Sequence, residues 1–208
     1  MEDVRNHLPA LLLGLFGACK GVPVPPPSGA ENALLGIQVR IVSFETGKTF
    51  YPNRVWFARI EKGTESTQVF ESSYARGQTV YLLNAAPGRY AAVAVGELVD
   101  GKTDFTYLPK ECIRATEVTV EAGKSAFAGM LAAKRRVGLA DRDESMAHYS
   151  GLVNPLPARE SALSILFARY RNHHVFDFTV DRSPERTGRF HAEAEKHLAK
   201  AGWGDRLP

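Results

Sequence analysis

The stretch Gly36-Ile37-Gln38-Val39-Arg40-Ile41 decides the fold class, because apolar and polar residues alternate along it. A period of two places the apolar side chains on one face of a β-strand. Similar strand-like stretches follow at 54–60, 67–71, 79–83, 90–99, 112–120 and 125–131. Short glycine-containing turns separate them, with no helical crossover between strands. The sequence therefore predicts a mainly β fold, an antiparallel β-sandwich over residues 36–136.

One turn in this region has a recognisable sequence, Pro87-Gly88-Arg89-Tyr90. Proline suits the first central position of a type II turn and glycine suits the second, where φ is positive. Tyr90 is then expected to face the core at the start of the next strand. The Pro-Gly-x-Tyr pattern resembles the turn of transthyretin-like and carboxypeptidase-regulatory-like β-sandwiches. That resemblance implies a sandwich fold and assigns no active-site residue, since the turn is structural in those families.

After residue 136 the pattern becomes helical. Residues 137–157 have little periodicity and predict a loop, and a first helix is expected from Ala158 onward. Its apolar residues recur at helical spacing, at Leu163, Leu166, Phe167 and Tyr170. A strand-like stretch at 175–180 joins it to a second helix.

The second helix has clear start and stop signals. Ser183 is the expected N-cap, Pro184 the first helical residue and Gly202 the end. The apolar stripe of this helix consists of Phe190, Ala194, Leu198 and Ala201. We expect residues 137–208 to form a loop and a two-helix region packed on the sandwich, so that the whole chain is α+β.

The N-terminal residues indicate export. An apolar run at 8–16 is too short to cross a bilayer but suits a signal peptide. The sequence Phe16-Gly17-Ala18-Cys19 that ends it resembles the lipobox of bacterial lipoproteins. The resemblance implies a signal peptide at 1–18, cleavage before Cys19, and attachment of diacylglycerol and palmitate to that cysteine. Residues 19–35, which are rich in proline, are expected to form a stiff tether.

The same resemblance implies a location. Lys20 follows the cysteine, and a residue other than aspartate at this position favours the outer membrane of a Gram-negative cell. The expected partners are therefore the membrane, through the N-terminal lipid, and an envelope protein. The alternative is an N-terminal apolar helix that docks on the domain.

Charge argues against nucleic acid as a partner. The formal net charge is +3, and removal of Glu2, Asp3 and Arg5 leaves +4 on the chain that begins at Cys19. Lysine and arginine are interleaved with acidic residues instead of forming a basic stripe. We therefore expect no nucleic-acid binding.

The chain contains two cysteines, Cys19 and Cys112. If Cys19 carries lipid, Cys112 has no partner for an intrachain disulfide. Cys112 is then expected to be a small buried residue within the strand-like stretch at 112–120. Without lipidation, a bridge between the two cysteines is conceivable.

Metal-binding side chains gather only near the C-terminus. His191 and Glu195 are spaced i, i+4 on one helix face, as are Glu193 and His197. His173 and His174 precede them. This pattern differs from the His-Glu-x-x-His arrangement of zinc enzymes, and a polar helix face explains it without a metal.

Other chemistry has no support in the sequence, which contains no nucleophile elbow, phosphate loop or dinucleotide fingerprint. The large aromatics Trp56, Tyr74, Tyr107 and Trp203 fit core packing better than a carbohydrate or peptide groove. We expect no catalytic residue and no cofactor. The sequence thus favours a lipid-anchored envelope protein that acts as a non-catalytic binding or structural module, its ligand unknown. The alternative is a metal-dependent envelope enzyme using His191, Glu195, His173 and His174.

Overall fold

The computed structural model describes residues 23–60, 68–99, 102–137 and 173–208. Its elements are, in chain order, β1 (Ala33–Ser43), β2 (Thr49–Phe50), β3 (Arg54–Ile60), β4 (Gln68–Glu71), β5 (Tyr74–Arg76), β6 (Thr79–Ala85), β7 (Gly88–Val99), β8 (Lys102–Tyr107), α1 (Lys110–Ala115), β9 (Val118–Val120), β10 (Ser125–Val137), β11 (His173–Asp181), α4 (Pro184–Leu198), η1 (Ala199–Ala201) and η2 (Gly204–Arg206). The first expected helix, with Leu163 to Tyr170, lies outside the described residues.

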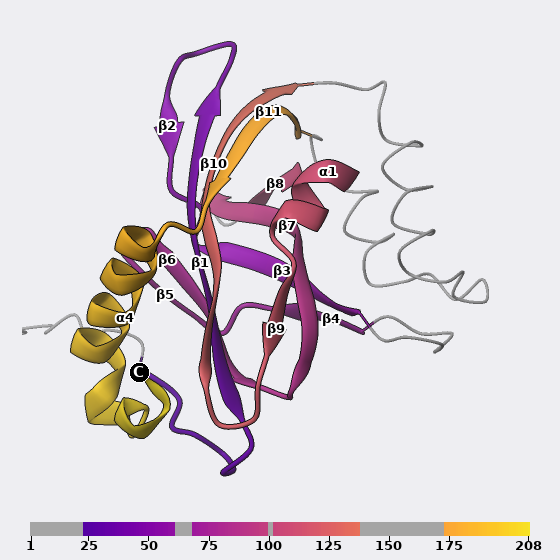
Figure 1. The fold of residues 1–208 in the computed structure, drawn as a ribbon. Helices are drawn as coiled ribbons and strands as arrows, with labels where there is room; N and C mark the ends of the chain where they lie inside the picture. The colour runs from indigo at the N-terminus through magenta and orange to yellow at the C-terminus, as the bar shows by residue number, and fades with distance from the viewer. Residues whose placement is uncertain (1–22, 61–67, 100–101, 138–172) are drawn as a thin grey trace, which may run out of the picture.

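The strands form a sandwich with a C-terminal helix, as the sequence predicts (Figure 1). Their hydrogen-bonded order is β4-β3-β7-β8-β11-β10-β1-β6-β5, with β2 beside β1 and β9 beside β7. Most neighbours are antiparallel, but β1 pairs with β10 in parallel, and β11 pairs with β8 in parallel. Strand β10 thus lies between β1 and β11, and β11 lies between β10 and β8, although these neighbours are far apart in sequence. The alternation of residues along each strand does not reveal such pairings.

The inner core lies between the two layers. On β1, Leu35, Ile37, Val39 and Ile41 all point into it and are fully buried, which confirms the predicted alternation. On β3 the consecutive residues Val55, Trp56 and Phe57 are all buried, as are residues 33–39 on β1. Consecutive side chains point to opposite faces, so both faces of β3 are covered.

The outer core lies on the opposite face of β1, β6 and β10, under helix α4 (Figure 1). Its members are Leu34, Tyr81, Leu83, Phe127, Met130, Phe190, Ala194, Leu198 and Trp203. The Phe190 ring stacks on Phe127, with centroids 4.6 Å apart. Gly36 makes room for this ring, because a Cβ there would lie only 2.2 Å from Phe190 Cε2. The predicted stripe of the helix is thus buried as expected at Phe190, Ala194 and Leu198.

Both ends of the C-terminal helix are as predicted. Ser183 Oγ accepts a hydrogen bond from Arg186 N at 3.4 Å, and Pro184 occupies the first helical position. The helix passes through η1 and stops at Gly202, whose φ of 88° is left-handed. Glycine adopts this conformation at little cost.

Two local expectations are wrong. The stretch 112–120 is not one strand: Cys112 lies in the short helix α1, and only Val118–Val120 forms a strand. Gly88 does not occupy a type II turn, since its φ is 156° and it already pairs with Val120. Tyr90 is nevertheless buried as expected, and its hydroxyl donates to Ala86 O at 2.8 Å.

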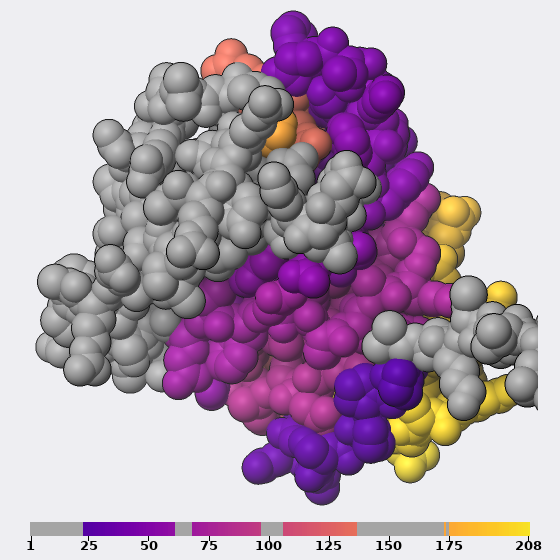
Figure 2. Space-filling model, turned by 180° about the vertical axis from the view of Figure 1, so that it is seen from behind, coloured from indigo at the N-terminus to yellow at the C-terminus, as the bar shows by residue number. Residues whose placement is uncertain are grey.

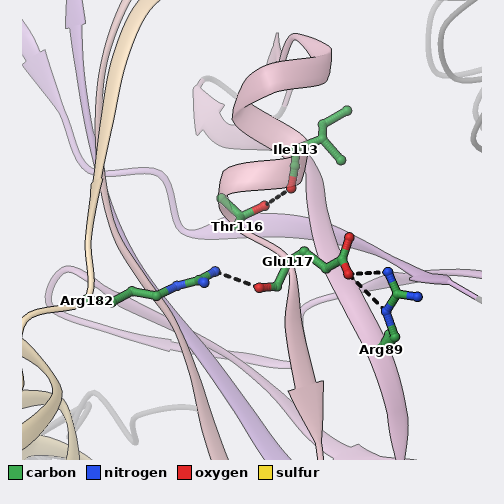
Figure 3. Close-up of polar contacts among 5 residues, drawn as sticks. All are labelled: Arg89, Ile113, Thr116, Glu117 and Arg182. Carbon is green, nitrogen blue, oxygen red and sulfur yellow. Dashed lines mark hydrogen bonds and ion pairs between the residues drawn. The ribbon is translucent and has the colours of Figure 1, made fainter.

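Arg182 connects the two layers near the start of α4 (Figure 3). Its Nε donates to Ala128 O of β10 at 3.0 Å, and its Nη2 donates to Glu117 O at 2.8 Å. The Glu117 carboxylate accepts in turn from Arg89 Nε of β7 at 2.9 Å. Arg182 therefore bridges β10 and the segment between α1 and β9.

The proline-rich segment, expected to be a tether, lies against the domain from Pro23 onward. Figure 2 shows it in indigo beside the yellow C-terminal residues. Trp203 Nε1 donates to Pro25 O at 2.8 Å, and Arg206 Nη2 donates to Gly29 O at 2.7 Å. Asn84, with a left-handed φ of 60°, donates to Pro26 O at 3.1 Å. This part of the chain is therefore docked by side chains from β6 and from the C-terminal turns.

Candidate functional site

His191 and Glu195 lie on α4, but in different surroundings. The half-buried His191 ring packs edge-on against Phe190, and its Nδ1 is 3.4 Å from Ser125 Oγ. Burial lowers the pKa of His191 below its usual value. Glu195 is exposed to solvent.

His173 lies at the other end of the sheet. It pairs with Val137 at one end of β10, whereas His191 contacts Ser125 at the other end. A rise of about 3.3 Å per residue places the two ends of β10 roughly 40 Å apart. The structure therefore does not bring His173 and His191 together. The His174 side chain lies outside what the structure describes.

Metal-ligating side chains do not cluster in the described ranges 23–60, 68–99, 102–137 and 173–208. No group of three or more His, Cys, Asp or Glu side chains there could hold a metal ion. Sequence spacing placed His191 and Glu195 on one helix, but no further ligand approaches them from the described strands. The expected set of His191, Glu195 and His173 is thus not one site.

Cys112 is fully buried, as expected, although in α1 and not in a strand. Burial raises the pKa of its thiol to about 12, so it remains protonated and unreactive at neutral pH. Cys19 and Lys20 precede the first described residue.

The four large aromatics pack in the cores, as the sequence favours. Trp56 and Tyr107 are buried in the inner core, and Trp203 in the outer core. Tyr74 is half-buried and packs against the outer core, 5.9 Å from Tyr81 between ring centroids.

A cleft runs between α4 and the turn that joins β5 to β6. We call it the α4 cleft; its volume is about 500 Å³. It is lined by Gln38, Arg76, Gly77, Gln78, Arg186, Arg189, Glu193, Lys196 and His197. A cleft of this size can hold a small organic ligand.

Positive charge dominates the α4 cleft, where four cationic side chains surround one carboxylate. Arg186 pairs with Asp181 at 3.4 Å and Arg189 with Glu185 at 2.5 Å, both outside the lining. Such exposed pairs contribute at most about 1 kcal/mol each, so these arginines can turn toward a ligand. Within the described part of the chain, Arg76 and Lys196 have no ion-pair partner.

Two buried side chains donate hydrogen bonds to the Glu193 carboxylate of the α4 cleft. Glu193 Oε2 accepts from Gln38 Nε2 at 3.2 Å and from Thr79 Oγ1 at 3.1 Å. Gln38 is 5 % exposed and Thr79 is fully buried. Buried polar groups hold a fixed geometry once they are satisfied. The floor of the cleft is therefore preorganised.

Tyr81 lies under the same floor, in the outer core. Burial raises the pKa of its phenol, and the nearby Glu193 carboxylate adds a smaller rise. Tyr81 is therefore neutral at physiological pH, and its ring packs between Tyr74 and Phe190 in the outer core.

Sequence reasoning identified only part of this cleft. The i, i+4 spacing of Glu193 and His197 was recognised, but as a candidate metal pair. Arg186, Arg189 and Lys196 share a helix face with Glu193, a signal that could have been found. Arg76, Gln38 and Thr79 come from distant strands, and no local pattern connects them to α4.

Comparison with known proteins gives no relative. No known family matches the chain, and no curated protein and no solved structure matches it. Among the described residues, no helix is both long enough and apolar enough to cross a membrane.

Proposed function

We propose that this chain is a lipid-anchored cell-envelope protein that acts as a non-catalytic binding module. Cys19 is the proposed lipidation site, and Lys20 is the reason for placing the protein at the outer membrane. The sandwich, which we relate to the transthyretin-like and carboxypeptidase-regulatory-like proteins, provides the scaffold.

The docking of the proline-rich segment is the observation that supports this proposal most. Pro25 O accepts from Trp203 Nε1 at 2.8 Å, and Pro25 lies six positions after Cys19. Six residues reach roughly 20 Å when fully extended. A lipid on Cys19 would therefore hold the C-terminal end of α4 close to the membrane surface, at a restricted range of distances.

The α4 cleft supports a binding role over a purely structural one. Its last lining residues, Lys196 and His197, stand within two residues of the end of α4, which Trp203 connects to Pro25. A polar, preorganised cleft contributes nothing to core burial. It therefore fits recognition of a ligand near the membrane surface.

Substitution of Cys19 tests the anchor directly. Wild-type cells fed labelled palmitate should yield a labelled protein in the membrane fraction, and Cys19→Ser should yield an uncleaved, unlabelled one. Attachment needs the thiol, and several acyl chains are required for stable membrane binding.

Cys112→Ser is the matched control, because Cys112 is buried in α1. Its labelling should equal that of the wild type. If Cys19→Ser were labelled and membrane-bound like the wild type, the lipoprotein proposal would be wrong.

A further inference from the structure

We propose that the α4 cleft binds a phosphorylated sugar or a similar polyol phosphate. This inference rests on the binding role proposed above and names its ligand class. The shared chemistry is a phosphate group next to hydroxyl groups, carried either by a soluble metabolite or by a lipid headgroup.

The cations of the α4 cleft select for phosphate. Arg186, Arg189 and Lys196 lie on one face of α4, and Arg76, the last residue of β5, lies opposite them in the lining of the cleft. Neighbouring like charges repel one another, so the arrangement is stabilised by an anion between them. Arginine also binds phosphate through two parallel hydrogen bonds, which a point charge cannot do.

Glu193 selects for hydroxyl groups beside that phosphate. Its Oε2 is occupied by Gln38 and Thr79, and in the described part of the chain Oε1 has no hydrogen-bond donor. A free carboxylate oxygen accepts from hydroxyl groups and repels a second anion. A sugar with one phosphate satisfies both the cations and this oxygen.

The volume of the cleft also favours a sugar phosphate over a bare phosphate ion. About 500 Å³ is far more than a bare phosphate ion fills, and it matches a small organic molecule. Phosphate alone would leave Glu193 and much of the cleft in contact with water.

Calorimetry on the full chain in a nonionic detergent tests the proposal. The probes are glucose 6-phosphate, unphosphorylated glucose and glycerophosphoglycerol, a soluble phospholipid headgroup. Glucose 6-phosphate should bind and glucose should not. Tighter binding of glycerophosphoglycerol assigns the site to a lipid headgroup, and weaker binding assigns it to a soluble phosphate ester.

A double variant, Arg76→Gln with Lys196→Gln, should weaken binding of the phosphorylated probe by at least about tenfold, since two charge-assisted contacts are lost. Both side chains are exposed, so the fold should be retained, which circular dichroism checks. The matched control is Lys110→Gln with Arg114→Gln, an exposed pair on α1 outside the cleft. It removes the same charge and should bind like the wild type.

Three results overturn the inference. They are no heat of binding with either phosphorylated probe at millimolar concentration, glucose binding as tight as glucose 6-phosphate, or equal loss of affinity in both double variants. None of them bears on palmitate labelling at Cys19, so failure of the ligand assignment is distinguishable from failure of the anchor.

Discussion

The inner core and the outer core share strands β1, β6 and β10 but are built differently. The inner core is made mainly of aliphatic residues that alternate along strands, such as Leu35 and Ile37. The outer core depends on a few large rings that fit one another, above all Phe190 on Phe127 and Trp203. Both cores are close-packed, so removal of a buried side chain is costly in either one. The face that carries the α4 cleft depends in addition on the fit of a few rings, which overpacking disturbs.

The largest expected effect comes from the same substitution in each core. Leu131→Ala in the inner core and Leu198→Ala in the outer core should each lower the free energy of unfolding by roughly 2 to 5 kcal/mol, since both leucines are fully buried. Equilibrium denaturation measures both. A single transition with an unchanged denaturant slope is expected for each variant. A separate early transition for Leu198→Ala alone would mean that α4 is detachable from the sandwich.

Two glycine substitutions test the contact between β1 and α4. Gly36→Ala places a Cβ against Phe190 and should destabilise by about 1 to 3 kcal/mol, as overpacking does. Gly188→Ala, on the exposed side of α4 with nothing within 4 Å, should stabilise by about 0.5 to 1 kcal/mol. Thermal melts of the two variants measure whether each substitution lowers or raises the stability of the fold. A neutral Gly36→Ala would show that the Phe190 ring moves aside without cost.

The next prediction concerns the hydrogen bond between Trp203 and the docked N-terminal segment. Trp203→Phe keeps an aromatic ring in the outer core but removes the donor to Pro25 O. The lost hydrogen bond accounts for about 1 kcal/mol, and the smaller ring in this fully buried position adds a cavity cost. Amide exchange should also quicken at Val24 and over residues 28–32, which have backbone N–H groups, while the inner strands keep their protection. Unchanged exchange there would mean that Asn84 and Arg206 hold the segment without Trp203.

The smallest effect is the pH dependence contributed by His191. Burial lowers its pKa in the folded protein, so below about 6.5 the unfolded state binds the proton more readily. The stability that depends on neutral His191 is therefore complete above that pH and is lost as pH falls through the lower folded pKa. His191→Gln should flatten this part of the profile in denaturation at about pH 7.5 and about pH 5. A variant profile parallel to the wild type would contradict the burial of His191.

Several elements could be predicted because their signals are local. Ser183, Pro184 and Gly202 mark the ends of the last helix, and alternation marks β1. Helix α1 was missed because six residues are too few to show a helical period. Its local signals are Pro109 at the N-cap, Glu111 in the first turn and Arg114 in the last.

The α4 cleft was missed for a different reason. Gln38 and Thr79 hold Glu193 across 155 and 114 positions of sequence. Strand patterns show which face is buried but not which strands become neighbours. A local sequence pattern therefore cannot predict the part of the site that depends on pairing between distant strands.

The parallel pairing of β1 with β10 also sets an order for folding. Roughly 80 residues separate Ser43 from Ser125, and closure of so long a loop slows folding. During synthesis β1 can pair with β6 early, but its other edge stays open until β10 emerges. Until then that edge exposes unpaired backbone N–H and C=O groups, which are prone to aggregation. Helix α4, made last, closes the outer core, so a nascent chain shortened before Pro184 should remain bound to chaperones.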